Sequence, residues 1–377
     1  MGTQHRRGFA GGCMLHPPDP KKAKPPMLGG VAGVSGINTL SKDVEGYGTR
    51  KLRTNATGRY LLGGCTDKIS HRLLRCANHL NWRWYPEQDH RVLSAAKFCQ
   101  LHLLCPNCAH RRASKQGAKV HEKLNHLADQ FDYWFITLTV ANGPDLLERY
   151  RHLVKSFGKL RNLSRDHLRG KGRYVELSRA KGLVWAYEFT HSEETGWHPH
   201  IHMIAALPKG AAPIRWGIHP TTGEISPLRA DWHAVTGDSI ITHARPVDMA
   251  DPHKAVCELV KYSLKFSDLS IPDSVEAWDA LRGKKLCESS GALRGVDIPE
   301  SDDLLDDLLT GEYYEFLYKW HGDAYTLVGN TWRTEQNLLE SPYSNTGDTD
   351  GHSVTAANGI PQGQPCAERV RQVEGAC

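Results

Sequence analysis

The stretch His198-Pro199-His200-Ile201-His202 decides the fold, because it places three imidazoles at every second position. In a β-strand, alternate side chains point to opposite faces of the sheet. The three histidines would therefore share one face, and Ile201 would point into the opposite layer. Neutral imidazoles on a rigid strand are typical ligands of a divalent cation. A chain with 21 histidines can also contain a chance cluster, so other parts of the sequence must decide between the two interpretations.

The composition predicts a protein without membrane spans that works in a reducing compartment. The chain has 377 residues, 40% of them hydrophobic, which is enough for one substantial core and a smaller module. No apolar run approaches the roughly 20 residues that a membrane helix needs. There are ten cysteines and no signal peptide, and closely spaced thiols in a reducing interior more often bind metal than form disulfides. We therefore expect a cytoplasmic protein with no membrane partner.

Both ends of the chain lack the periodicity of folded segments. Residues 1–58 are rich in Gly, Pro, Lys and Ser, and nine basic residues stand against three acidic ones up to Arg53. This composition predicts a disordered basic arm, whose charge suits a phosphate backbone unless the arm is an inert solvated tail. Residues 341–377 are rich in Gly, Asn, Ser and Gln, which predicts a second disordered tail.

Between these ends, the spacing of apolar residues predicts alternating strands and helices. Strands are expected over 134–140, 182–190, 198–207, 239–247 and 313–320, and helices over 146–160, 228–235, 254–266 and 275–287. The short segment 192–196 joins the second and third strands, so these two should form an antiparallel hairpin. The fold class is therefore α+β, with helices packed on an antiparallel sheet.

A third metal ligand follows from this hairpin. If its two strands pair, Glu188 comes near His200 and His202. A carboxylate with two imidazoles suits Mg²⁺ or Mn²⁺, although imidazole also binds iron, zinc and nickel. The same set also fits an oxygenase with two histidines and one carboxylate. The histidines alone therefore leave both hydrolytic and oxidative chemistry open.

A second chemical signal lies in the helix expected over 254–266. Glu258 and Tyr262 stand one turn apart, and Lys261 and Lys265 form a second pair beside them. A phenol is a poor nucleophile at neutral pH, but a divalent cation and nearby lysines make its attack on a phosphodiester feasible. A carboxylate one turn away could then act as general base for release of the DNA. Tyr262 alone would be a half-buried core aromatic, but together with the histidines it favours cleavage through a phosphotyrosine ester.

Three segments in this order resemble a known family. They are Phe135-Ile136-Thr137-Leu138-Thr139-Val140, then Trp197-His198-Pro199-His200-Ile201-His202-Met203, then Glu258-x-x-Lys261-Tyr262-x-x-Lys265. They resemble the ordered motifs of plasmid rolling-circle replication initiators, which are HUH endonucleases. The nearest branch has a single tyrosine, with a glutamate one turn before it. The resemblance covers about residues 74–329, and the histidine motif alone is shared with transposases and conjugative relaxases.

The resemblance implies a domain and a role for each residue. An HUH nicking and strand-transfer domain with a central antiparallel sheet flanked by helices would occupy residues 129–340. His200 and His202 would bind Mg²⁺ or Mn²⁺, with either Glu188 or His198 as a further ligand. The catalytic residues would be Tyr262 as nucleophile, Glu258 as the base for termination, and Lys261 and Lys265 as phosphate-holding groups.

The resemblance also implies a biological role. A strand-specific nick at a double-strand origin, on an extruded hairpin flanked by duplex, would leave Tyr262 joined to the 5′ phosphate and a free 3′ hydroxyl for a host DNA polymerase. The sequence has no Gly-rich phosphate loop, so strand separation would need a host helicase. An oligomer is compatible with this role. A transposase or mobilisation relaxase with the same residues, and a non-catalytic DNA-binding regulator, are the alternatives.

A cysteine-rich segment precedes the first of these motifs. Cys105-Pro106-Asn107-Cys108 has metal-ligand spacing, and Cys99 and Cys76 complete four thiolates for a tetrahedral structural zinc site. Cys65, His102 or His110 could substitute for Cys76. Residues 59–128 should therefore form a small zinc module ahead of the catalytic domain.

A basic stripe follows the cysteines along an expected helix, and it consists of Arg111, Arg112, Lys115, Lys119 and Lys123. Positive side chains at one-turn steps beside a zinc module suit duplex DNA, whose phosphates supply most of the affinity. The alternative is an ordinary solvated helix face.

Overall fold

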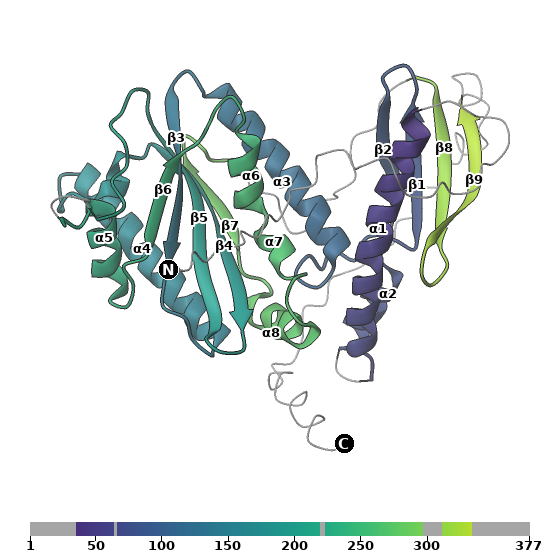
Figure 1. Cartoon of the computed structure of the whole chain (residues 1–377), viewed down its shortest axis with the longest axis horizontal. Coiled ribbons are helices and arrows are strands. Elements are labelled where there is room, and N and C mark those ends of the chain that lie inside the picture. Colours follow the sequence, from purple (N-terminus) through teal and green to yellow (C-terminus); the bar gives the residue numbers. More distant parts are fainter. Residues whose placement is uncertain (1–34, 64–65, 219–222, 297–310, 334–377) are drawn as a thin grey trace, which may run out of the picture.

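The computed structural model describes residues 35–63, 66–218, 223–296 and 311–333. These residues form an α+β structure with two antiparallel sheets, one of five strands and one of four. Figure 1 shows the two sheets on opposite sides of the molecule, with helices α3 and α1 between them. The predicted α+β class with an antiparallel sheet flanked by helices is confirmed.

The five-stranded sheet carries the histidine motif. Its strand order is β6 (Thr242–Pro246), β3 (Phe131–Thr139), β5 (Gly196–Pro208), β4 (Gly182–Ser192) and β7 (Cys287–Gly291). The hairpin predicted around residues 192–196 is present, because β4 and β5 pair antiparallel up to Ser192 opposite Gly196. The histidine strand is thus the middle strand, held by β3 on one side and β4 on the other.

One face of this sheet is covered by α4 (Leu146–Leu168), which begins at Asp145, whose side chain accepts a hydrogen bond from the Glu148 amide. The Phe157 ring of α4 packs edge-on against Trp185 with centroids 5.4 Å apart. The 3₁₀ turn Glu176–Arg179 and α5 (Pro227–Thr236) contact the same helix. Because side chains alternate along β5, Ile201 points to this apolar layer and the neighbouring histidines point to the opposite face.

The histidine face is covered by α6 (His253–Val260) and α7 (Tyr262–Lys265), which in turn pack against α3 (Pro106–His126). The sequence predicted one helix over 254–266, whereas the structure breaks it at Lys261. The helix predicted over 275–287 is also shorter. It is α8 (Ile271–Leu281), and Cys287 begins the edge strand β7 instead.

The four-stranded sheet joins segments far apart in the sequence. Its order is β2 (His90–Ala96), β1 (His79–Tyr85), β8 (Tyr313–Trp320) and β9 (Tyr325–Arg333). The strand predicted over 313–320 therefore exists, but its assignment to the histidine sheet is wrong, because β8 pairs with β1. After β2 the chain leaves this four-stranded sheet, and it returns to the sheet at β8.

A long helix, α1 (Ser35–Tyr60), packs beside this second sheet, and the shorter α2 (Asp67–Arg75) packs against α1. The prediction of a disordered arm is wrong for residues 35–58. Leu40, Val44 and Tyr47 recur at helical spacing and are buried, so this segment does bury an apolar stripe. Residues 1–34 and the tail predicted over 341–377 lie outside the described residues. No helix in the described part is long and apolar enough to cross a bilayer.

Candidate functional site

At the centre of the histidine face, two threonines of β3 lie opposite two histidines of β5. Thr139 of β3 lies opposite His200 of β5, and Thr137 lies opposite His202. Each threonine hydroxyl is 3.1 Å from the Nδ1 atom of its histidine. With Nδ1 engaged, Nε2 is the ring nitrogen that each histidine can offer to a metal. The two rings are nearly parallel, with an interplanar angle of 22° and centroids 6.2 Å apart.

Glu188 of β4 lies on the same face as the two histidines. It lies opposite His200 in the register, and its Oε2 is 3.4 Å from Nε2 of His202. The side chain is buried, and among the described residues Oε2 accepts no hydrogen bond with good geometry. A buried carboxylate oxygen in this position, beside two imidazoles, fits a divalent cation.

The protonation states also suit metal binding. Burial lowers the pKa of His200 to about 4, and the charges of His202, His198 and Lys261 act in the same direction against that of Glu188. Burial would raise the pKa of Glu188, but His202, Lys261 and His200 hold it below its usual value. A neutral imidazole and an ionised carboxylate are the forms that ligate metals at neutral pH.

His198 has a different place from the other two histidines. Its Nε2 hydrogen-bonds Thr195 Oγ1 and lies 3.5 Å from Ser192 Oγ, and both hydroxyls belong to the hairpin turn. His198 therefore contributes to the order of the hairpin, while the buried carboxylate that approaches His202 is Glu188.

Glu258 and the two lysines line the half-exposed side of the α6–α7 segment. Glu258 Oε2 accepts from Arg245 Nη2 at 2.6 Å, and the Arg245 guanidinium lies over the Phe135 ring. Phe135 in turn packs beside the His202 ring, which places Glu258 on the histidine side of the sheet.

The two lysines differ in their surroundings. Lys261 is close enough for its charge to lower the pKa values of Glu188 and His200. Lys265 instead pairs with Asp268 at 3.6 Å. Lys261 is therefore the lysine that belongs to the histidine face in this conformation.

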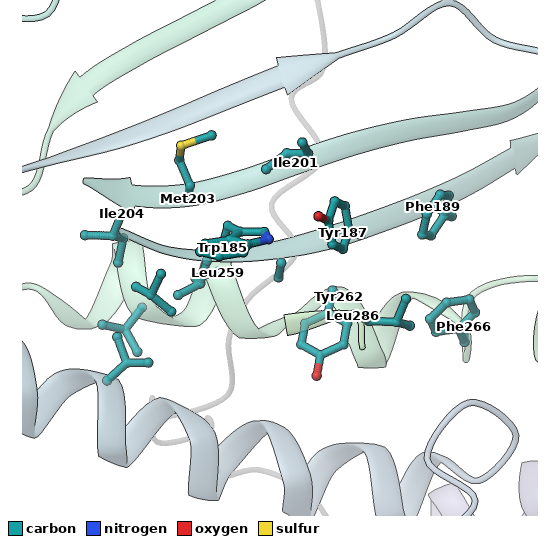
Figure 2. Close-up of a cluster of buried hydrophobic side chains, with 14 of the residues drawn as sticks. Trp185, Tyr187, Phe189, Ile201, Met203, Ile204, Leu259, Tyr262, Phe266 and Leu286 are labelled. Carbon is teal, nitrogen blue, oxygen red and sulfur yellow. The ribbon is translucent and has the colours of Figure 1, made fainter. Parts of the chain in front are cut away.

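Tyr262 is not brought to the histidines in this conformation. Its side chain is 2% exposed, and its hydroxyl donates to Gln116 Oε1 of α3 at 3.2 Å. Figure 2 shows the Tyr262 ring beneath the sheet with its hydroxyl pointing away from β4 and β5. Tyr262 lies on the same buried side of this segment as Leu259 and Phe266. Glu258 and Tyr262 are one turn apart, yet Glu258 contacts Arg245 of β6 and Tyr262 contacts Gln116 of α3.

The predicted group of four cysteines is confirmed. The sulfur atoms of Cys76, Cys99, Cys105 and Cys108 all lie within 4.8 Å of one another, and all four residues are buried. A metal such as zinc could bind this cluster, because four thiolates make a closed tetrahedral site. His102 and His110 are not part of the group, and Cys65 lies outside the described residues.

Helix α1 supports the cysteine cluster through two residues that the sequence did not reveal. Lys51 is buried, and its Nζ donates to the carbonyls of Leu74 and Cys76 at 2.9 and 2.6 Å. The Thr54 hydroxyl is 3.4 Å from Cys105 Sγ. A buried ammonium near four thiolates offsets their charge. The only sequence signal was the helical spacing of Leu40, Val44 and Tyr47 upstream.

The predicted basic stripe on α3 divides into two parts. Arg111 and Arg112 are buried, and Arg111 donates to the Tyr47 hydroxyl and lies over Phe98. Arg111 thus faces α1, and because both arginines are buried they do not form the proposed phosphate-binding face in this structure. Lys115, Lys119 and Lys123 are half-exposed along one side of α3.

Comparison with known proteins connects this region to replication. Residues 90–212 match the model of a family described as "Replication protein". A "Protein rep" of Bacillus amyloliquefaciens is 34% identical over 145 residues, which cover 36% of this chain and 39% of the relative. A "Protein rep" of Bacillus sp. is 33% identical over 150 residues, covering 38% of this chain and 44% of the relative.

A third relative is covered almost completely. A "Protein rep" of Staphylococcus aureus is 24% identical over 238 residues, which are 62% of this chain and 97% of that protein. The chain thus spans about two fifths of the length of the two Bacillus relatives. No solved structure matches the chain significantly. These likenesses are to replication proteins, and the family match contains His200 and His202 but ends before Glu258 and Tyr262.

Proposed function

We propose that the protein initiates rolling-circle replication of a plasmid by nicking one strand of its origin DNA, as an HUH endonuclease of the single-tyrosine branch. The observation that carries this proposal is the pairing of Thr137 and Thr139 with His202 and His200, next to the buried carboxylate of Glu188. The replication-protein family match covers all five of these residues.

The histidine face would supply the metal ligands and part of the positive charge that phosphodiester cleavage requires. His200, His202 and Glu188 would hold Mg²⁺ or Mn²⁺, which supplies charge stabilisation at a phosphate oxygen when bound. Lys261 adds a positive charge beside this set. The threonine hydroxyls fix the orientation of the two imidazoles, so the ligands are placed before DNA arrives.

The reaction that fits is transesterification by Tyr262. Its hydroxyl oxygen would attack phosphorus, the bond from phosphorus to the 3′ oxygen would break, and the phenolic proton would be lost as the 3′ oxygen gains one. Glu258 is the general base for the later release of the DNA, and Lys265 would help to hold the scissile phosphate. The free 3′ hydroxyl would prime a host polymerase, with a host helicase separating the strands.

This mechanism requires α7 to rearrange. Tyr262 must leave Gln116, and the break at Lys261 provides a point where the four-residue helix can rotate. Binding of origin DNA is the event that would supply the free energy for this change.

The test is formation of a covalent complex. The full chain is incubated with Mn²⁺ and single-stranded oligonucleotides that tile the plasmid origin, and products are separated under denaturing conditions. We expect an adduct with one fragment, which disappears with chelator and in the His200→Ala and His202→Ala variants. No adduct with any fragment, or an adduct that survives in both variants, would contradict the proposal.

The burial of Tyr262 favours a second candidate, a DNA-binding regulator without nicking activity. This candidate predicts origin binding without any adduct, so the same experiment separates the two. A transposase or mobilisation relaxase would give the adduct with DNA from a transposon end or a transfer origin instead.

A further inference from the structure

A basic pocket lies beside the cysteine cluster, between α2 and the segment 97–100 that precedes α3. It has a volume of about 540 Å³. Five basic side chains line it, from Lys68, His71, Arg72, Arg75 and Lys97, and no carboxylate does. The sequence pointed to α3 as the DNA-binding helix, so this concentration of positive charge is a feature that the fold reveals.

Helix α2 presents its positive charges on one side. Lys68, Arg72 and Arg75 follow one another at about one-turn steps and are exposed, whereas Ser70 and Leu73 on the opposite side are buried. The eight residues from Lys68 to Arg75 span about 10 Å of helix, which is comparable to a few phosphates along one DNA strand.

The positive charge of this pocket is not compensated within the described part of the chain. There, Lys68, Arg75 and Lys97 make no ion pair with a carboxylate. Other cations of the molecule are paired, such as Arg91 with Asp43 and Arg173 with Asp231. Uncompensated cations that converge on one concave surface create a strong local positive potential, which attracts a polyanion.

The pocket is also held in a fixed shape. Cys76, which ends α2, and Cys99 of the facing segment both line the pocket and both belong to the four-cysteine cluster. The guanidinium of Arg72 donates to the Cys99 carbonyl at 2.5 Å and joins the two walls directly. Helix and segment therefore keep their spacing, which places the cations before a ligand binds.

We propose that this pocket binds the phosphate backbone of duplex DNA that flanks the nick site. The proposal rests on the proposed function, which supplies DNA as the ligand. Duplex is favoured over single-stranded DNA because cations dominate the lining, and Phe98 is the only Phe, Tyr or Trp among the lining residues. The Arg111 guanidinium lies over one face of the Phe98 ring, 4.7 Å from its centroid, so the pocket lacks the row of open aromatic rings on which successive unpaired bases stack.

The test is salt-dependent binding of an origin duplex by the full chain. The Lys68→Ala/Arg75→Ala double variant removes two exposed cations that have no ion-pair partner in the described part of the chain. The slope of log affinity against log salt should become shallower by about 1.8, which corresponds to about thirtyfold weaker binding at 0.15 M salt. The Lys68→Arg/Arg75→Lys variant should bind as the wild type does.

A matched control removes the same charge elsewhere. Lys155 and Lys159 are exposed on α4, on the far face of the histidine sheet, and the Lys155→Ala/Lys159→Ala variant should bind within about threefold of wild type. An equal loss of affinity in the two alanine variants would overturn the proposal, because binding would then follow net charge. So would unchanged duplex binding in Lys68→Ala/Arg75→Ala.

Nicking of a single-stranded oligonucleotide separates this proposal from the proposed function. We expect the Lys68→Ala/Arg75→Ala variant to form the covalent adduct with single-stranded DNA at the wild-type rate. If the wild-type protein forms no adduct, but the Lys68→Ala/Arg75→Ala variant binds the duplex more weakly than the wild type, the proposed pocket is upheld and the proposed nicking function is contradicted. If the adduct with single-stranded DNA is lost together with duplex binding, the assignment of the pocket to flanking duplex is overturned.

Discussion

The two candidate centres of the molecule differ in how complete they are. The four cysteines are buried with their sulfur atoms within 4.8 Å of one another. Two residues of α1 contact them, Lys51 at the Cys76 carbonyl and Thr54 at the Cys105 sulfur. On the histidine face, Glu188, His200 and His202 are in place, but Tyr262 is turned toward Gln116. A structural metal centre would need only its ligands, whereas the proposed strand-transfer centre would also need its nucleophile, which would reach the histidines only when DNA is bound.

The largest effect is expected at the cysteine cluster, if it holds zinc. A structural zinc site contributes about 10 kcal/mol or more to folding, which is comparable to the stability of a whole domain. Chelation, or Cys105→Ser, should therefore lower the midpoint of thermal unfolding by more than about 10 °C, as measured by calorimetry. Cys257→Ser, which changes a half-buried cysteine outside the cluster, should shift it by less than about 3 °C. If chelator leaves the midpoint of thermal unfolding unchanged, the cluster is stable without metal.

The next effect is expected at the histidines. His202→Ala removes a proposed ligand and should slow adduct formation about a thousandfold, because a catalytic metal supplies several kcal/mol of charge stabilisation. His198→Ala changes only the hairpin turn and should slow it by less than about tenfold. Single-turnover kinetics with a labelled oligonucleotide measure both rates. Equal losses in the two variants would show that His198 is also a ligand.

A smaller effect is expected at the threonine that orients His202. Thr137→Val keeps the shape of the side chain but loses the hydroxyl that contacts Nδ1. Mn²⁺ affinity should fall about 10- to 100-fold, as is usual when a group that orients a metal ligand is lost. Thr137→Ser, which keeps the hydroxyl, should restore most of it. Titration calorimetry measures these affinities, and an unchanged affinity in Thr137→Val would argue against a metal on Nε2 of His202.

The smallest effect concerns the contact that holds Tyr262 away from the histidines. Gln116→Leu removes the acceptor of the Tyr262 hydroxyl, a hydrogen bond worth about 1 kcal/mol. If Tyr262 must leave this contact to react, adduct formation should become about fivefold faster. Gln130→Leu, an exposed position, should leave the rate unchanged. A slower reaction in Gln116→Leu would mean that the contact is part of the reactive state.

Local patterns predicted the parts of both centres that depend on neighbouring residues. Alternation along 198–202 placed the histidines on one face, and the short hairpin brought Glu188 beside them. The cysteine cluster was predictable in the same way, because two of its members, Cys105 and Cys108, are only three residues apart in the sequence.

The failures concern which side of an element is buried. Helical spacing put Arg111 and Arg112 on a stripe with the lysines, but only the folded structure shows that both arginines are buried, with Arg111 packed against Tyr47 of α1. It likewise put Tyr262 one turn from Glu258 without showing that α3 covers Tyr262. In α1, Gly46, Gly48 and Gly58 hid the signal of a helix that buries one of its sides, so that the segment looked like a flexible arm. The pairing of β8 with β1 spans more than two hundred residues, which local pattern does not reach.

The most direct measurement identifies the residue that carries the DNA. The covalent complex formed with Mn²⁺ is digested with protease, and the peptide joined to the 5′ phosphate is sequenced by mass spectrometry. We expect the nucleotide to be attached to Tyr262, and Tyr262→Phe to form no adduct although it still binds Mn²⁺. Attachment to any other residue, or an undiminished adduct in Tyr262→Phe, would contradict the assignment of Tyr262 as the nucleophile.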